Sequence, residues 1–465
     1  MVDATRCLDT APIWVQLSDY VPDAPRLSGS GRADLVIVGG GLAGLATAYY
    51  AAKARPELKI TVLEAGRIGA GATGASTGIV GPGLKMSIPL LRKTYGDQLA
   101  RAAFDASQHG VDLLRELIKA EGIDCDAREE PHTLAAITAR QRDRMATHLS
   151  HLEQLGRRVD WLDPQELVER AGPGYVAGFS YDNVLLVDPY RLLVGLAAVV
   201  RGLGVEIHEY SRVLEMRTAR GGTTTVSTAG ADITADRVLM ALDGYAGPLN
   251  PFPRSVVPIR AHLLATAPLT DEQAARLGWN GRGGIIDQRN YFNYYRMTAD
   301  RRLVFGGGPV LVPTGDPVPD ARSADAVHDR LLLEMAARFP ALRDIDVVAR
   351  WTARAGSTQD RLPVVSELPG RPGVFYAGAW CGHGLSLAVD SAWRFGGFLG
   401  GRTDSALPWT RPRRFGLPRP ALETGTRLYL RMLDIADWHD IRTGASTAPP
   451  TPSTQTLRTK EAARS

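Results

Sequence analysis

A glycine-rich segment near the start of the chain has the residue types and spacing of a dinucleotide-binding turn. Gly39, Gly41 and Gly44 occupy the three glycine positions of the GxGxxG pattern, with Leu42 and Ala43 between the last two. In such a turn the first glycine permits a tight bend, the second lets a pyrophosphate approach the backbone, and the third lets a helix pack closely on a strand. The NH groups at the start of that helix would then bind the phosphates.

The elements that must position this turn are a buried strand before it and a helix after it. Residues 34–39 form an apolar run typical of a strand buried on both faces of a parallel sheet. Residues 40–55 have apolar side chains at helical spacing, and residues 59–64 form a second short strand. Glu64 ends that strand 25 residues after Gly39, where a carboxylate can accept hydrogen bonds from a ribose. The βαβ unit predicts a dinucleotide site but does not by itself distinguish FAD from NAD.

A second glycine-rich stretch, residues 69–83, follows the βαβ unit and favours FAD. Its small side chains leave backbone NH groups and hydroxyls facing whatever lies against them. A flexible surface loop is the alternative interpretation. The apolar Ile79 and Val80 favour a buried, ordered loop.

Composition predicts a folded protein of more than one domain. Of its 465 residues, 44% are hydrophobic and 22% charged, and 54 basic against 50 acidic side chains leave a net charge of +4. At roughly 150 residues per domain, this length suggests two or three domains with a large core. The composition excludes intrinsic disorder for the body of the chain.

Several partners and compartments are disfavoured. Outside residues 411–414 no dense basic stretch occurs, so we expect no nucleic-acid partner. Apolar runs such as residues 192–200 fall short of the roughly 20 residues of a membrane span, so we expect no membrane partner. Three dispersed cysteines have no metal-binding spacing, which predicts neither a metal site nor a disulfide framework. Asp3, Arg6 and Asp9 stand where a signal peptide would be apolar, which predicts a cytoplasmic protein.

Local patterns predict a mixed α/β chain. Periodicity predicts helices over residues 98–120 and 141–155, and Asp-Pro pairs at Asp163 and Asp188 indicate two helix N-termini. Short strands are expected within residues 204–242, 303–308 and 373–379.

Five later segments carry motifs that occur in the same order in one family of flavoproteins. They are GATGASTG at residues 71–78, VLMALDGY at 238–245 with VPIR at 257–260, DQRNYFNYYR at 287–296 with RLVFGG at 302–307, Trp351 through Gly356 to DRLP at 360–363, and YAGAWCGHG at 376–384. Together with the GxGxxG segment they resemble the D-amino acid oxidase superfamily, specifically the glycine and sarcosine oxidase-like branch that includes gamma-glutamylputrescine oxidase. The resemblance covers about residues 34–399. Ala75, Ser76 and Thr77 stand where the family has Arg, Asn and Gly.

The resemblance implies a Rossmann-type, doubly wound FAD-binding domain and a substrate domain with an antiparallel sheet that covers the flavin. We expect the following division: an N-terminal extension over residues 1–32, the FAD-binding domain over 33–95, 180–250 and 345–405, the substrate domain over 96–179 and 251–344, a helical C-terminal extension over 406–443, and a disordered tail over 444–465.

The resemblance also implies most of the site. The expected FAD contacts are Gly39, Gly41, Leu42, Ala43, Gly44, Glu64, Ala65, Gly71, Ala72, Thr73, Ser76, Thr77, Val213, Asp243, Gly356, Asp360, Gly378, Trp380, Gly382, His383, Gly384 and Leu385. His383, Tyr295 and Arg260 are the expected catalytic residues: Arg260 would pair with a substrate carboxylate and Tyr295 would orient an amine. A packing role for Tyr295, and a turn histidine bonded to nearby backbone for His383, are the alternatives. Cys381 is expected to be a buried thiol that is not linked to FAD.

The function implied is FAD-dependent oxidation of an amine or amino acid to an imine, with O2 as the acceptor and H2O2 as the product. One alternative is a flavin dehydrogenase that passes electrons to a quinone or a protein. The altered residues at positions 75–77 leave open a flavoenzyme of specialised metabolism or a flavoprotein without catalysis. An NADPH-dependent monooxygenase is disfavoured, because no second complete GxGxxG is present.

Overall fold

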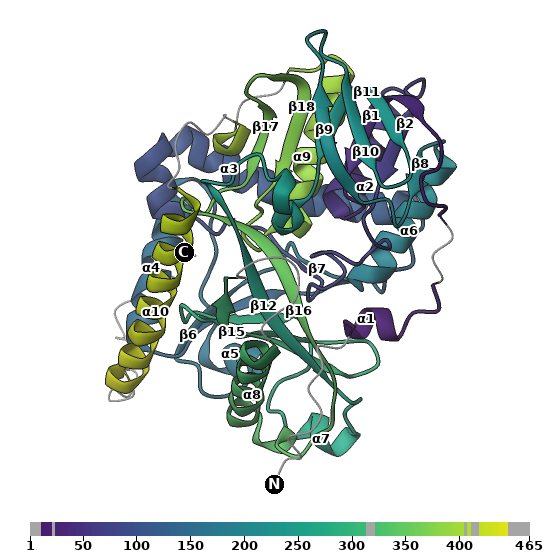
Figure 1. Ribbon diagram of the computed structural model, residues 1–465. Helices are drawn as coiled ribbons and strands as arrows, with labels where there is room; N and C mark the ends of the chain where they lie inside the picture. Colours follow the sequence, from purple (N-terminus) through teal and green to yellow (C-terminus); the bar gives the residue numbers. More distant parts are fainter. Residues whose placement is uncertain (1–10, 21–23, 313–320, 404–406, 411–417, 445–465) are drawn as a thin grey trace, which may run out of the picture.

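Two large sheets, each with helices packed on it, form the protein (Figure 1). The computed structural model describes residues 11–20, 24–312, 321–403, 407–410 and 418–444. The expected disordered tail lies almost entirely outside these residues.

The first sheet contains the predicted βαβ unit. Its strands are ordered β17-β18-β11-β1-β2-β8, and β10 and β9 continue from β11 as an antiparallel extension. The four neighbouring pairs from β18 to β8 are parallel. The strands are β1 (Gly31–Val38), β2 (Ile60–Leu63), β8 (Glu206–His208), β9 (Val213–Thr218), β10 (Thr224–Thr228), β11 (Asp232–Met240), β17 (Val364–Leu368) and β18 (Arg371–Gly378).

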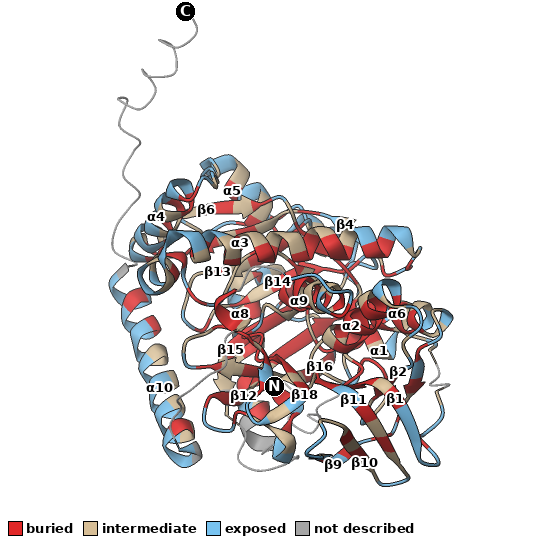
Figure 2. Cartoon of the chain, turned by 90° about the horizontal axis from the view of Figure 1, so that it is seen from above, coloured by how far each residue is buried: buried red, intermediate tan, exposed pale blue. Residues whose placement is uncertain are grey.

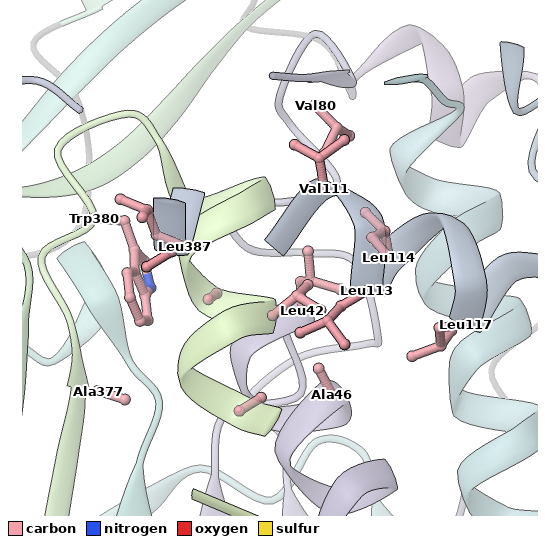
Figure 3. Close-up of a cluster of buried hydrophobic side chains, with 14 of the residues drawn as sticks. Leu42, Ala46, Val80, Val111, Leu113, Leu114, Leu117, Ala377, Trp380 and Leu387 are labelled. Carbon is pink, nitrogen blue, oxygen red and sulfur yellow. The ribbon is translucent and has the colours of Figure 1, made fainter. Parts of the chain in front are cut away.

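Helices α2 (Leu42–Ala54), α3 (Ile88–Ala120), α6 (Pro189–Gly202) and α9 (Gly384–Leu399) pack with this sheet around one apolar core. Figure 3 shows part of that core, where Leu42 and Ala46 of α2 lie near Leu113 and Leu117 of α3. Helix α3 begins ten residues before the expected start and bends at Gly96, whose φ of +80° is not helical. The core therefore holds α2, which carries the GxGxxG turn, in place.

The second sheet has the order β16-β12-β15-β14-β13-β5-β6 and is antiparallel except for the β13–β5 pair. Its strands are β5 (His132–Ala136), β6 (Ala177–Tyr181), β12 (Val256–Thr266), β13 (Gly284–Asp287), β14 (Tyr294–Met297), β15 (Leu303–Leu311) and β16 (Val347–Thr358). Helix α8 (Ala321–Arg338) packs on it. The predicted fold class, a doubly wound sheet with an antiparallel substrate sheet, is confirmed.

Strand pairing places two segments differently from the expected division. β16 pairs with β12 along its length, so residues 347–358 belong to the substrate sheet. Residues 96–120 continue α3, which packs against α9 of the first sheet. Boundaries placed at loops in the sequence therefore do not coincide with the boundaries between the two sheets and their helices.

The remaining elements are short or lie at the edges. They are α1 (Ile13–Gln16), the small sheet of β3 (Ile79–Val80), β7 (Leu185–Leu186) and β4 (Arg128–Glu129), α4 (Ala139–Gln154), α5 (Pro164–Ala171), η1 (Asp243–Tyr245), η2 (Gly247–Leu249), α7 (Asp271–Ala275), η3 (Pro340–Leu342), η4 (Pro408–Thr410) and α10 (Arg419–Gly444). Asp163 and Asp188 cap α5 and α6 as predicted. Within the expected C-terminal extension the structure describes α10, and Figure 1 shows it along the outside of the molecule.

Candidate active site

The GxGxxG turn has glycines at two positions where a side chain would collide with backbone. Gly39 has a φ of +113°, and a Cβ there would lie 2.6 Å from the carbonyl oxygen of Ala241. A Cβ on Gly44 would lie 1.9 Å from the carbonyl oxygen of Gly39, so only glycine lets α2 approach β1 this closely. At Gly41 the nearest atom to such a Cβ is the Thr73 hydroxyl oxygen, 3.7 Å away. The turn is therefore tight at its ends and leaves room beside Gly41, where a phosphate would approach.

The Glu64 carboxylate lies beside this turn. Its two oxygens accept hydrogen bonds from the NH groups of Gly40 and Gly66, both at 2.8 Å. Burial raises the pKa of the Glu64 carboxyl, and these backbone NH groups oppose the rise. Each oxygen has a further lone pair, and the neighbouring Ala65 is exposed. The remaining lone pairs of the carboxylate can thus accept the predicted ribose hydroxyls.

Residues 69–78 are the first part of the second glycine-rich stretch and are called the glycine-rich loop. Two indole groups from distant parts of the chain hold this loop. The Nε1 of Trp351, on β16, donates to the carbonyl oxygen of Ala75 at 2.9 Å. The Nε1 of Trp14, on α1, donates to the carbonyl oxygen of Ser76 at 2.9 Å. These bonds confirm a buried, ordered loop, and they link it to the substrate sheet and to the N-terminal extension.

A buried arginine holds the end of the same loop. The Arg296 guanidinium donates to the carbonyl oxygens of Gly78 at 3.1 Å and Val187 at 2.8 Å. Burial lowers the pKa of Arg296 to about 10. The side chain remains charged at neutral pH and fixes the loop beneath β14.

One carboxylate joins three of the sequence motifs. Asp243, which follows β11, accepts hydrogen bonds from the NH groups of Gly356 at 2.9 Å and Trp380 at 3.1 Å. Burial raises the pKa of Asp243, and four backbone NH groups oppose that rise. A Cβ on Gly356 would lie 2.9 Å from the Asp243 Oδ1 atom. The structure therefore gives Asp243 the task of holding the segment before α9 against β16.

His383 stands at the start of α9 with its side chain turned away from the helix NH groups. It is the N-cap residue but makes no side-chain cap, and its Nδ1 lies 3.4 Å from the carbonyl oxygen of Cys381. Burial and the nearby charge of Lys85 lower the pKa of His383 to about 4. The imidazole is therefore neutral at physiological pH. The NH groups of Gly384 and Leu385 are left for another acceptor, such as a flavin carbonyl.

Two titratable residues that the sequence did not single out, Lys85 and His132, interact electrostatically with His383, and Phe292 lies against Lys85. The Lys85 ammonium lies 4.4 Å from the ring centre of Phe292. Much of the Lys85 side chain is accessible, but surrounding protein atoms desolvate the ammonium group and lower its pKa to about 8. Burial and His383 lower the pKa of His132 to about 4. Lys85 is one of six lysines in the chain and follows the glycine-rich loop, a position that could have drawn attention to it.

Tyr295 lies elsewhere. Its hydroxyl donates to the carbonyl oxygen of Ala171 at 3.0 Å, and its ring stacks on Phe305 in the core beneath α8. Successive side chains of a strand point to opposite faces, so Tyr294 takes the other face and packs in the cluster that contains Trp351. The structure does not bring Tyr295 to His383, because the strand register turns it into the core.

Arg260 also lies on the face of the substrate sheet that packs against α8. It shares a face of β12 with His262, whose ring centre lies 5.3 Å from that of His328 on α8. The opposite face carries Leu263, which belongs to the cluster with Ala75 of the glycine-rich loop. Arg260 is therefore not placed to bind a carboxylate beside His383.

The other expected FAD contacts lie in the segments just described. Val213 begins β9, two residues after Ser211, whose NH donates to the carbonyl oxygen of Glu64 at 2.7 Å. Asp360 follows β16 and accepts a hydrogen bond from the Leu362 NH at 3.2 Å. Gly71, Ala72, Thr73 and Thr77 belong to the glycine-rich loop, Leu42 and Ala43 begin α2, and Gly378 and Gly382 flank the turn before α9. Their contacts with FAD remain predictions.

Cys381 is a free, buried thiol, and its Sγ donates to the carbonyl oxygen of Ala379 at 3.2 Å. Burial raises its pKa, so it is protonated at neutral pH. Within the described part of the chain, no group of three His, Cys, Asp or Glu side chains is placed to hold a metal ion.

These features fit FAD: the room at Gly41, the remaining lone pairs of Glu64 and the uncapped start of α9 suit the phosphate, ribose and ring carbonyl groups of that cofactor. Comparison with known families agrees, since residues 34–393 match the family model described as "FAD dependent oxidoreductase".

Individual relatives cover most of the chain. A probable oxidoreductase OrdL of Rhizobium meliloti is 29% identical over 79% of this chain and 83% of its own length. The gamma-glutamylputrescine oxidoreductase of Escherichia coli is 29% identical over 77% of this chain and 82% of its own. Among solved structures, glycine oxidase from Geobacillus kaustophilus superposes with a TM-score of 0.68 at 22% identity, covering 83% of this chain and 100% of that one.

Proposed function

The chain belongs to the family of FAD-dependent oxidoreductases, and from this premise we propose that it oxidises the C–N bond of an amine or amino acid to an imine, with O2 as electron acceptor. Relatives named for gamma-glutamylputrescine and for glycine support this substrate class. Hydrolysis of the imine then gives a carbonyl compound and an amine.

The observation that carries the proposal is the electrostatic character of the group around His383. His383 and His132 are neutral at physiological pH, whereas Lys85, with a pKa of about 8, is mostly charged. A lysine cation attracts a substrate carboxylate and disfavours a protonated amine at the same place. The site therefore favours an amine that is neutral when bound, whose C–H bond can be oxidised without a strong base.

FAD supplies the acceptor for the two electrons and the hydrogen that leave the substrate carbon. The chain's own residues bind and orient the substrate around it. Lys85 would hold a carboxylate, Phe292 limits the movement of the ammonium group by lying against it, and His383 presents a neutral imidazole to the substrate. Tyr294, on the face of β14 opposite Tyr295, adds a hydroxyl that burial keeps protonated, because burial raises its pKa.

The test is an anaerobic absorption titration of the purified, FAD-loaded protein with D-amino acids, N-methyl amino acids and polyamines. We expect one class to bleach the flavin band. The variant Lys85→Met should raise KM for carboxylate-bearing substrates and leave the KM for polyamines unchanged, while the exposed Lys93→Met serves as the matched control. Retained flavin that no amine bleaches would contradict the proposal and favour a flavoprotein without amine turnover.

Admitting air to the reduced protein then tests the acceptor. Rapid return of the flavin band with release of H2O2 supports the oxidase. A flavin that stays reduced in air and returns only with a quinone would instead make the protein a dehydrogenase.

A further inference from the structure

The C-terminal helix α10 lies beyond the segment that matches the family, residues 34–393, and is fixed to the substrate domain by one face. Asp437 accepts hydrogen bonds from the backbone NH of Tyr291 at 2.7 Å and of Asn290 at 2.8 Å. Asp440 accepts one from the Thr138 hydroxyl at 3.2 Å. Both carboxylates are buried. The helix is thus anchored, and its opposite face is turned outward.

That outward face carries four large apolar side chains. Leu428, Met432, Ile435 and Trp438 are 61%, 59%, 67% and 59% exposed. Their spacing of three or four residues puts them on one stripe of the helix, which we call the exposed stripe. Figure 2 shows α10 as a mostly exposed ridge at the edge of the molecule. A contiguous apolar stripe of this kind indicates an interaction surface.

Three arginines lie beside the exposed stripe. Arg427, Arg431 and Arg442 are exposed next to it, and the guanidinium of Arg442 lies 4.8 Å from the ring centre of Trp438. The acidic residues of the same turns are directed elsewhere, as the anchoring carboxylates show, and Asp434 pairs with Arg330 of α8. The helix therefore offers an apolar stripe bordered by arginines.

The charge of the whole C-terminal region agrees. Residues 411–465 contain ten Arg and Lys against five Asp and Glu, a net charge of +5, although the complete chain has only +4. The rest of the protein is therefore slightly negative. Within α10 four arginines are balanced by four acidic residues, so the excess of basic residues lies in the sequence before and after the helix, and the arginines beside the exposed stripe are Arg427, Arg431 and Arg442.

We propose that α10 docks the protein on an anionic lipid surface, with the exposed stripe buried at the boundary between headgroups and acyl chains. An apolar face with a tryptophan and flanking arginines suits such a surface. A second copy of the same helix fits less well, because pairing would bring two rows of arginines together. Among the described residues no helix is long and apolar enough to cross a bilayer, so the contact is peripheral. The expectation of no membrane partner considered only spanning segments.

The experiment is sedimentation of the FAD-loaded, full-length protein with vesicles of phosphatidylcholine alone or with added phosphatidylglycerol. We expect at least about tenfold more protein bound to the anionic vesicles, and weaker binding in high salt. Ile435→Glu should lower that binding about tenfold or more, since it removes apolar area and adds a repelled charge. Leu333→Glu, at a 73% exposed leucine of α8, is the matched control and should bind as the wild type does.

Flavin absorbance and circular dichroism of each variant show that it is folded. Equal binding of wild type and Ile435→Glu, or no preference for anionic vesicles, would overturn the proposal. So would a wild-type dimer that Ile435→Glu converts to a monomer while neither binds vesicles, because the stripe would then be covered by a second copy.

Discussion

Replacing Glu64 by glutamine tests the cofactor site at its best-defined contact. The carboxylate accepts two backbone NH groups at 2.8 Å, from Gly40 and Gly66. A glutamine keeps one carbonyl oxygen, so its NH2 group must face one of those NH donors, and one charge-assisted bond is lost. Such a bond contributes about 1.5–3 kcal/mol.

Two magnitudes follow from that loss. With an unfolding entropy of about 2.1 cal/mol/K per residue over 465 residues, about 1 kcal/mol corresponds to about 1 °C in Tm, so the FAD-free variant should melt about 1.5–3 °C lower. The sequence predicts that the carboxylate also accepts ribose hydroxyls; on that prediction a further charge-assisted bond is lost on binding, and the Kd for FAD should rise about 10- to 100-fold.

The assay is titration of FAD-free protein with FAD, followed by flavin fluorescence, with a thermal melt of each variant. Glu57→Gln, the same change at an exposed glutamate, is the control and should match the wild type. If Glu64→Gln binds FAD within about threefold of the wild type, the ribose contact assigned to this carboxylate is refuted.

Three further predictions rest on single contacts. Gly44→Ala should abolish FAD retention, because its Cβ would lie 1.9 Å from a carbonyl oxygen, whereas Gly202→Ala, with no atom within 4 Å, should retain FAD; absorbance of the purified variants decides. Trp351→Phe should leave the buried Ala75 carbonyl unpaired at a cost of about 1–3 kcal/mol, seen as a Tm about 1–3 °C lower with weaker FAD binding. Lys85 loses its charge as pH rises through its pKa of about 8, so for a carboxylate substrate the ratio of wild-type to Lys85→Met kcat/KM should fall across that pH; a ratio that is flat with pH would contradict the role of Lys85.

Local chemistry was readable from the sequence. The strand, glycine turn and helix around Gly39 depend on residues close in the chain, and so does the cap at Asp163, whose capping box with Glu166 is present. Such features can be predicted without the tertiary structure. The family motifs added the prediction of two sheets, one for FAD and one for the substrate.

The two adjacent tyrosines of β14 show what the sequence left undecided. Tyr294 and Tyr295 have the same side chain, and a shift of one residue exchanges their faces. The face is set by pairing of β14 with β13 and β15 and by the packing of α8 against one side. Lys85 and His132 were missed for a related reason, since β5 brings His132 near His383 only through sheet pairing with β13.

The glycine-rich loop links two regions that lie far apart in the sequence, the substrate sheet and the N-terminal extension. Trp351 holds it from the substrate sheet, and Trp14 holds it from an N-terminal segment that lies outside the family match. The Ala75 carbonyl is buried and would otherwise lack a partner, so loss of the Trp351 indole costs more than loss of a surface hydrogen bond, whereas the Trp14 bond to Ser76 is only partly buried. The position of this loop, which is predicted to contact FAD, therefore depends on both the substrate sheet and the N-terminal extension being in place. The N-terminal segment, expected only as an extension, thus helps to hold a loop of the predicted cofactor site.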